Sequence, residues 1–106
     1  MSRSLIERRL VDVVDRLRQL HDDLSVLDEQ VAHFVEEADD ARLRSLVSET
    51  PLAEHEHREA ARHAEAMQRG RAELVAEIAR FESLQDDLLD QLQRLVGSSS
   101  ATPHEP

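Results

Sequence analysis

The sequence contains no cysteine, tryptophan, tyrosine or lysine, and it has only two glycines and three prolines. Without cysteine the chain cannot form disulfides, thiolate metal sites or a cysteine nucleophile. The scarcity of glycine and proline leaves few turns and favours long helices. The two glycines, Gly70 and Gly97, lie too far apart for a glycine-rich phosphate loop. Because a thin helical protein also offers few concave pockets, we expect a non-enzymatic protein without a cofactor.

Charge and hydropathy narrow the expected partners. The net charge is −10, and the only aromatic residues besides histidine are two phenylalanines. An acidic chain without stacking platforms is a poor nucleic-acid binder, because neutralisation of phosphate dominates that affinity. It should also be repelled by anionic membrane surfaces. No apolar run approaches the roughly 20 residues that span a bilayer, and no signal segment is recognisable, so we expect a cytoplasmic protein with no membrane contact.

Apolar residues recur at alternating steps of four and three along the first part of the chain. This heptad spacing predicts a coiled-coil-like helix over residues 4–47, whose apolar positions form a packing seam. Ser4 and Glu7 have the spacing of a capping box, which predicts that Ser4 begins the helix. The seam residues are Ile6, Leu10, Val13, Leu17, Leu20, Leu24, Leu27, Val31, Phe34, Ala38 and Ala41.

A second helix is predicted over residues 51–96, after a turn at residues 48–50. Ser48 or Thr50 can cap this helix, and Pro51 suits its first position. Residues 97–106 begin with a glycine stop and are otherwise small, polar and proline-containing, which predicts a disordered tail. The second seam consists of Ala60, Ala64, Met67, Arg71, Leu74, Ile78, Phe81, Gln85, Leu88, Leu92 and Leu95.

The short turn requires the two helices to run antiparallel. The predicted fold class is therefore all-α, with one domain built as a long antiparallel helical hairpin. In this register Phe34 should face the region of Ala64, and Leu10 should face Leu88.

Further apolar residues lie beside the seam and widen the apolar face beyond what two strands of a coiled coil need. We expect two hairpins to dimerise through this flank into a four-helix bundle; the alternative is that another protein covers it. The flank residues are Val14, Val35, Val75, Leu84, Leu89 and Val96.

The segment EHEHREAARH, residues 54–63, holds three histidines and three glutamates. His55, Glu59 and His63 are spaced four residues apart and so lie along one stripe of a helix. Imidazole and carboxylate groups at this spacing could bind a divalent ion such as Zn²⁺, with further ligands from a second chain. His57 falls instead at a seam position near Ala41. Without such ligands from a second chain the stripe is interpreted as a solvated helix surface, and no metal site is predicted.

Glu36, Glu37, Asp39 and Asp40 lie toward the closed end of the predicted hairpin, where a protein partner could reach them. A long antiparallel coiled coil with acidic residues near its tip resembles the transcription factors that insert a coiled-coil finger into the secondary channel of RNA polymerase. Glu36, Asp39 and Ala41 match that family's motif, acidic-x-x-Asp-x-Ala, although the family usually has Asp where Glu36 stands. The resemblance implies that Asp39 would modulate the catalytic magnesium of the polymerase.

These patterns predict a helical interaction or scaffolding protein that self-associates, most simply as a dimer, through its heptad seams. The acidic residues or the apolar flank would then contact another protein. Two alternatives remain open from the sequence: a coiled-coil finger that acts on RNA polymerase, and a metal-binding helical bundle.

Overall fold

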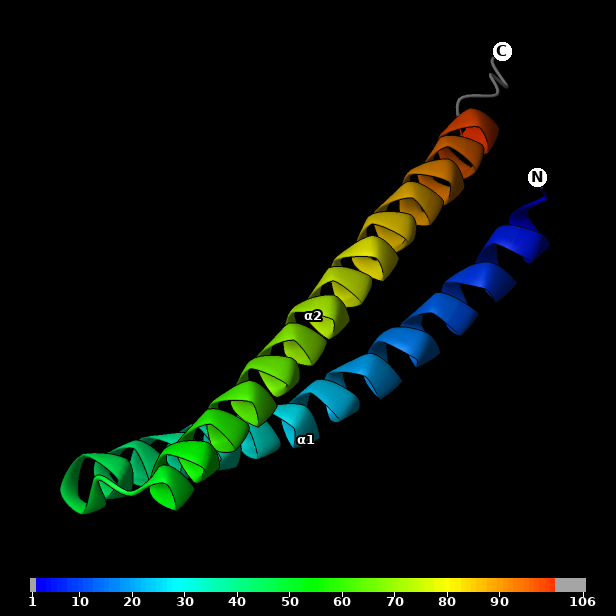
Figure 1. Cartoon of the computed structure of the whole chain (residues 1–106). Helices are drawn as coiled ribbons and strands as arrows, with labels where there is room; N and C mark the ends of the chain where they lie inside the picture. Colours follow the sequence, from blue (N-terminus) through cyan, green and yellow to red (C-terminus); the bar gives the residue numbers. More distant parts are fainter. Residues whose placement is uncertain (1, 101–106) are drawn as a thin grey trace, which may run out of the picture. The chain divides into compact units, whose positions relative to one another are not determined.

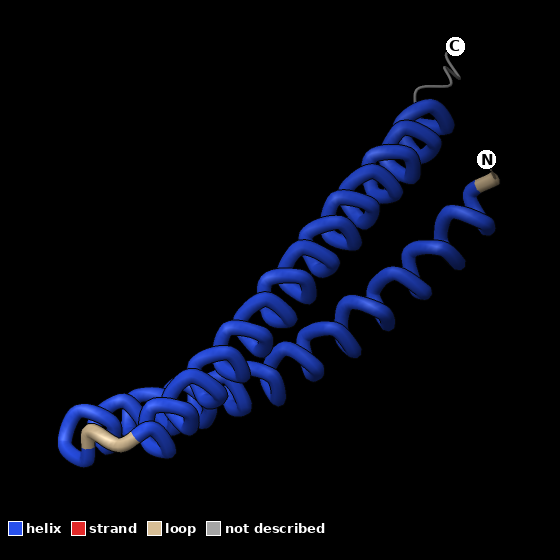
Figure 2. The backbone as a smooth tube through the Cα atoms, in the orientation of Figure 1, coloured by secondary structure: helices blue, strands red, loops and turns tan. Residues whose placement is uncertain are grey.

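Two long helices account for almost all of residues 2–100, the part of the chain described by a computed structural model (Figure 1). Helix α1 spans Arg3–Ser48, and helix α2 spans Pro51–Ser100. Residues 2–100 contain no β-strand (Figure 2). The predicted all-α helical hairpin is thereby confirmed. Neither helix, over the residues described, has a stretch long and apolar enough to cross a bilayer.

The chain divides into two compact units. The first unit combines the part of α1 up to His21 with the part of α2 from Glu77 onward. The second unit runs from Asp22 to Ala76 and contains the turn. Within each unit the segments of α1 and α2 pack against each other as an antiparallel pair (Figure 1).

Helix α1 begins earlier than its capping motif predicted. The hydroxyl of Ser2 accepts a hydrogen bond from the Leu5 N–H at 3.2 Å, and the Ser2 carbonyl accepts one from Ile6 N–H at 3.0 Å. Ser2 is therefore the N-cap, and the prediction that Ser4 caps the helix was wrong. Ser4 lies within the first turn, and Glu7 pairs with Arg3 at 3.7 Å instead of closing a capping box.

The turn between the helices consists of Glu49 and Thr50. Glu49 adopts a left-handed conformation with φ of 51°, and its N–H donates to the Ser45 carbonyl at 3.0 Å, which closes the C-terminus of α1. The Thr50 hydroxyl accepts a hydrogen bond from Ala53 N–H at 3.1 Å. Thr50 is thus the cap of α2, and Pro51 occupies its first position, where a missing N–H costs nothing.

The packing seam follows the predicted heptads. Every predicted seam residue is buried or half-buried except Leu95, which is exposed. The two units differ in the size of the side chains they bury. The first unit buries the aliphatic side chains of Ile6, Val13, Leu17, Leu20, Ile78 and Leu88, whereas in the second only Ala41, Ala53 and Ala64 are buried.

The end of α2 differs from the predicted tail. The helix continues through Gly97 to Ser100, because a glycine with an ordinary negative φ does not by itself end a helix. The rest of the predicted tail, residues 101–106, lies outside the described residues.

Candidate functional site

The heptad register assigns the flanking residues to two sides of the helix pair. Along each seam, positions reached by a step of three residues alternate with positions reached by a step of four. In an antiparallel pair, the residues that directly follow the step-of-three positions lie on one side of both helices. The residues that directly precede the step-of-four positions lie on the opposite side. Arg16 and Glu77 precede Leu17 and Ile78, and they meet: the Arg16 guanidinium donates to the Glu77 carboxylate at 3.1 Å. This contact identifies the charged side of the first unit.

An aromatic ring lies on the same charged side. The guanidinium carbon of Arg16 lies 5.9 Å from the centroid of the Phe81 ring, within the range of a cation–π contact. Leu84 follows Glu77 by one heptad and therefore belongs to this side as well. The predicted flank thus contained one residue, Leu84, that does not share a side with Leu89.

The opposite side of the first unit exposes apolar side chains from both helices, with Glu7 and Glu82 in the same register. Val14, Leu89 and Val96 follow the seam residues Val13, Leu88 and Leu95, so all three lie on this side. Val11, one helical turn before Val14, extends the same surface. All four side chains are exposed. We call Val11, Val14, Leu89 and Val96 the apolar flank.

The other two predicted flank residues belong to the second unit. Val35 and Val75 follow Phe34 and Leu74 and so occupy the corresponding side of that unit. Val35 is half-buried and Val75 is exposed. On this side Arg71 of the seam donates a hydrogen bond to Asp28, so this side of the second unit mixes apolar and charged groups.

The histidine stripe is divided among separate contacts. Glu59 pairs with Arg62, and the ring of His63 stacks on Phe34 with centroids 4.1 Å apart and planes at 20°. His55 is exposed. Among residues 2–100 no three histidine or carboxylate groups come together as a metal site. His57 is half-buried at the seam, as predicted, and its Nδ1 is buried without a hydrogen-bond partner.

The predicted acidic residues all lie on α1 before its end at Ser48. Glu36, Glu37, Asp39 and Asp40 are exposed, and Glu37 contacts His33 at 3.4 Å. Ala41, the third residue of the polymerase-factor motif, is instead buried in the seam.

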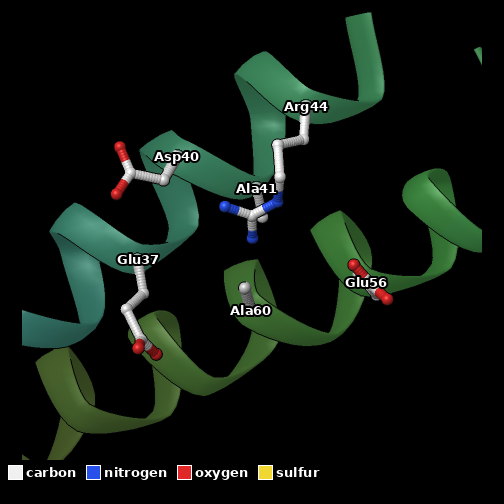
Figure 3. A pocket seen from close by; sticks show the side chains of 6 residues that line it. All are labelled: Glu37, Asp40, Ala41, Arg44, Glu56 and Ala60. Carbon is white, nitrogen blue, oxygen red and sulfur yellow. The ribbon is translucent and has the colours of Figure 1, made fainter. Parts of the chain in front are cut away.

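A shallow hollow lies beside these acidic residues. It measures about 280 Å³ and is lined by Glu37, Asp40, Ala41, Arg44, Glu56 and Ala60 (Figure 3). Figure 3 shows Arg44 reaching back over Ala41 and Glu37 pointing toward α2. The hollow exists because both helices contribute alanines at this point of the seam, which leaves room between the charged side chains.

Large apolar residues surround the turn, and the sequence reasoning missed them. Val47, Leu52, Leu46 and Leu43 are 85%, 67%, 62% and 61% exposed, the highest values for large hydrophobic side chains in the described part of the chain. The first seam ends at Ala41, so Leu43, Leu46 and Val47 fall outside the heptads. Their own spacing of three and four residues places them on one face of α1, and this was the available signal.

Comparison with family models, curated proteins and solved structures gives no match. The exposed surfaces of this chain are therefore the features from which its function is inferred.

Proposed function

We propose that this chain is a non-enzymatic helical interaction protein that self-associates through the apolar flank, Val11, Val14, Leu89 and Val96. The observation that carries the proposal is the difference between the two sides of the first unit. One side satisfies its charged groups within the chain through Arg16 and Glu77. The other side exposes apolar side chains contributed by both helices.

A pair of helices forms a single thin core, and an exposed apolar stripe is stabilised when another layer covers it. Burial of a valine or leucine side chain contributes about 1.5–3 kcal/mol. A second copy of the same flank is a suitable cover because a two-fold axis brings one patch onto itself. The result is a four-helix bundle, in which the Arg16–Glu77 side of each pair stays in solvent.

Electrostatics agrees with an apolar contact surface. The chain carries a net charge of −10, so two copies repel each other unless carboxylates stay out of the contact. Glu7 and Glu82 lie one heptad before Val14 and Leu89 and border the flank. At that position their carboxylates can remain in the solvated rim, which is where charged residues of interfaces are tolerated.

Leu89 and Leu84 provide a matched test. Both are exposed leucines of α2, at 46% and 40%, but they lie on opposite sides of the first unit. We expect Leu89→Asp to convert the protein to a monomer in sedimentation equilibrium, because the new charge would be desolvated in the interface. Leu84→Asp should leave the mass unchanged. Far-UV circular dichroism checks that both variants keep their helices.

Three results would contradict the proposal. A wild-type protein that is monomeric at every concentration excludes self-association. Loss of the dimer in Leu84→Asp alone places the interface on the Arg16 side. An unchanged dimer in Leu89→Asp places it elsewhere on the chain.

A further inference from the structure

The closed end of the second unit places its large apolar residues in an unexpected way. Where the helices pack, it buries Ala41 and Ala53, while Leu43, Leu46, Val47 and Leu52 remain exposed. A hairpin end selected for stability alone would show the reverse, because each large apolar side chain left in water forgoes the free energy of burial. Contiguous exposed apolar residues with a polar rim are typical of protein contact sites.

These residues shape the surface around the turn. Leu43 and Leu46 line a hollow of about 490 Å³ together with Asp39 and Arg42. Leu46 also lines a second hollow of about 350 Å³ with Ser45, Glu49, Thr50, Pro51 and Glu54. The two hollows adjoin at Leu46 and together connect the last turns of α1 to the first turn of α2. We call Leu43, Leu46, Val47 and Pro51 the closed-end patch.

The charges around the closed-end patch select the kind of partner. Residues 36–58 contain seven carboxylates and three arginines. One of these arginines, Arg58, contacts Glu54 at 4.0 Å, and this pair contributes no net charge, so carboxylates remain in excess. The rim of the patch is therefore negative. Such a field attracts cationic segments and opposes both a second copy of the same end and an anionic membrane surface.

We infer that the closed-end patch binds an amphipathic helix of another protein, with leucine-like side chains in the hollows beside Leu46 and arginine or lysine facing the surrounding carboxylates. Helix-in-groove recognition combines these two features, with apolar anchors at helical spacing and charges beside them. This inference goes beyond self-association through the apolar flank, because it uses residues of the other unit and a different partner.

A peptide pair tests the inference on the full chain. One peptide is an amphipathic helix with a leucine stripe, one tryptophan and lysine and arginine elsewhere; the second has glutamate in place of each cation. Because the protein has no tryptophan or tyrosine, peptide fluorescence reports binding without background. We expect the cationic peptide to bind at least about tenfold more tightly than the acidic one, and less tightly at high salt.

Substitutions separate specific docking from adsorption to an acidic surface. Leu43→Ser combined with Leu46→Ser keeps the charge and should weaken the cationic peptide at least about tenfold, as loss of apolar anchors does. Val26→Ser is the matched control, because Val26 is also on α1 and 57% exposed but far from the turn along the helix. It should change the affinity less than about twofold.

Several outcomes overturn the inference. Equal binding of the cationic peptide to wild type and to the double variant shows charge adsorption alone. Failure of the cationic peptide to bind below about 1 mM excludes the surface as a helix site. Loss of self-association in the double variant identifies the patch as a contact between copies, and binding of the wild type to phosphatidylserine vesicles identifies it as a membrane contact. Leu89→Asp should bind the cationic peptide normally, so failure of the dimer and failure of this site can be distinguished.

Discussion

The imidazole ring of His63 on α2 stacks on the phenyl ring of Phe34 on α1, with centroids 4.1 Å apart and an angle of 20° between the planes. His33, next to Phe34 in the chain, meets the same phenyl ring edge-on with centroids 5.3 Å apart. Phe34 is thus the centre of a small ring cluster in the second unit, at a level where the neighbouring seam residue of α2 is the alanine Ala64. His63 supplies the aromatic surface that the alanine cannot.

A double-mutant cycle should detect this stacking. We expect Phe34→Ala and His63→Ala to be coupled by about 0.5–1.5 kcal/mol in the free energy of unfolding, the usual value for an aromatic pair. Urea denaturation followed by circular dichroism measures the four corners of the cycle. The control cycle pairs Phe34→Ala with His55→Ala, since His55 is exposed and lies outside the ring cluster. Equal coupling in the two cycles would contradict a specific role for His63.

Arg71 is a charged residue at a seam position, and its removal should stabilise the protein. The Arg71 guanidinium donates to Asp28, but both side chains are nearly half exposed, so this pair contributes at most about 1 kcal/mol. Leucine at the same position would bury more apolar surface. We expect Arg71→Leu to raise the free energy of unfolding by about 0.5–2 kcal/mol, measured by thermal denaturation.

Asp28→Ala is the control for Arg71→Leu, because it removes the ion pair and leaves the seam unchanged. It should lower the free energy of unfolding by less than about 1 kcal/mol. If Arg71→Leu is instead more destabilising than Asp28→Ala, the arginine stem already packs in the seam better than leucine can.

Much of the fold could be predicted because burial and heptad spacing are tightly linked. A residue four or three positions after a buried one stays on the same face, so the steps from Ile6 to Ala41 identified the seam of α1. The turn was also predictable, since Thr50 and Pro51 have the side-chain chemistry that a helix start needs. The register predicted that Phe34 faces the region of Ala64, and Phe34 contacts His63, the residue next to Ala64 in the chain.

The candidate surfaces were harder to predict. Ser2 and Ser4 are equally suitable caps by residue type, and only the position of the first turn decides between them. Leu84 and Leu89 are equally apolar, and the heptad register already places them on opposite sides, but only the contact between Arg16 and Glu77 shows which side pairs its charges. The closed-end patch was not predicted because its residues lie outside the heptad repeat. Their significance comes from their high exposure, which the sequence does not give.

Glu49 should be replaceable by glycine without loss of stability. Its φ of 51° is left-handed, which costs a residue with a side chain roughly 1 kcal/mol that glycine avoids. The greater freedom of glycine in the unfolded chain offsets part of this gain. We expect the melting temperature to order as Glu49→Gly at or above wild type, and wild type above Glu49→Val, because a β-branched side chain resists positive φ. Identical melting temperatures for the glycine and valine variants would show that the turn in solution does not use this conformation.

Gly70 lies in the interior of α2, where the backbone is helical and its φ is not positive. A Cβ atom added at this position would meet no atom within 4 Å, so alanine fits without displacing a neighbour. We expect Gly70→Ala to raise the free energy of unfolding by about 0.5–1 kcal/mol, because alanine loses less backbone entropy in a helix. Thermal denaturation followed by circular dichroism measures the change.

Gly97→Ala is the matched control for Gly70→Ala. A Cβ atom at Gly97 also meets nothing within 4 Å, but Gly97 lies in the last turn of α2, which ends at Ser100. Helix ends fray, so the same substitution should gain much less there. If Gly70→Ala lowers stability while Gly97→Ala does not, the space beside Gly70 is filled in solution by a group from outside the chain. Repeating the melt at several protein concentrations would then show whether that group belongs to a second copy, since only a dimer has a concentration-dependent melting temperature.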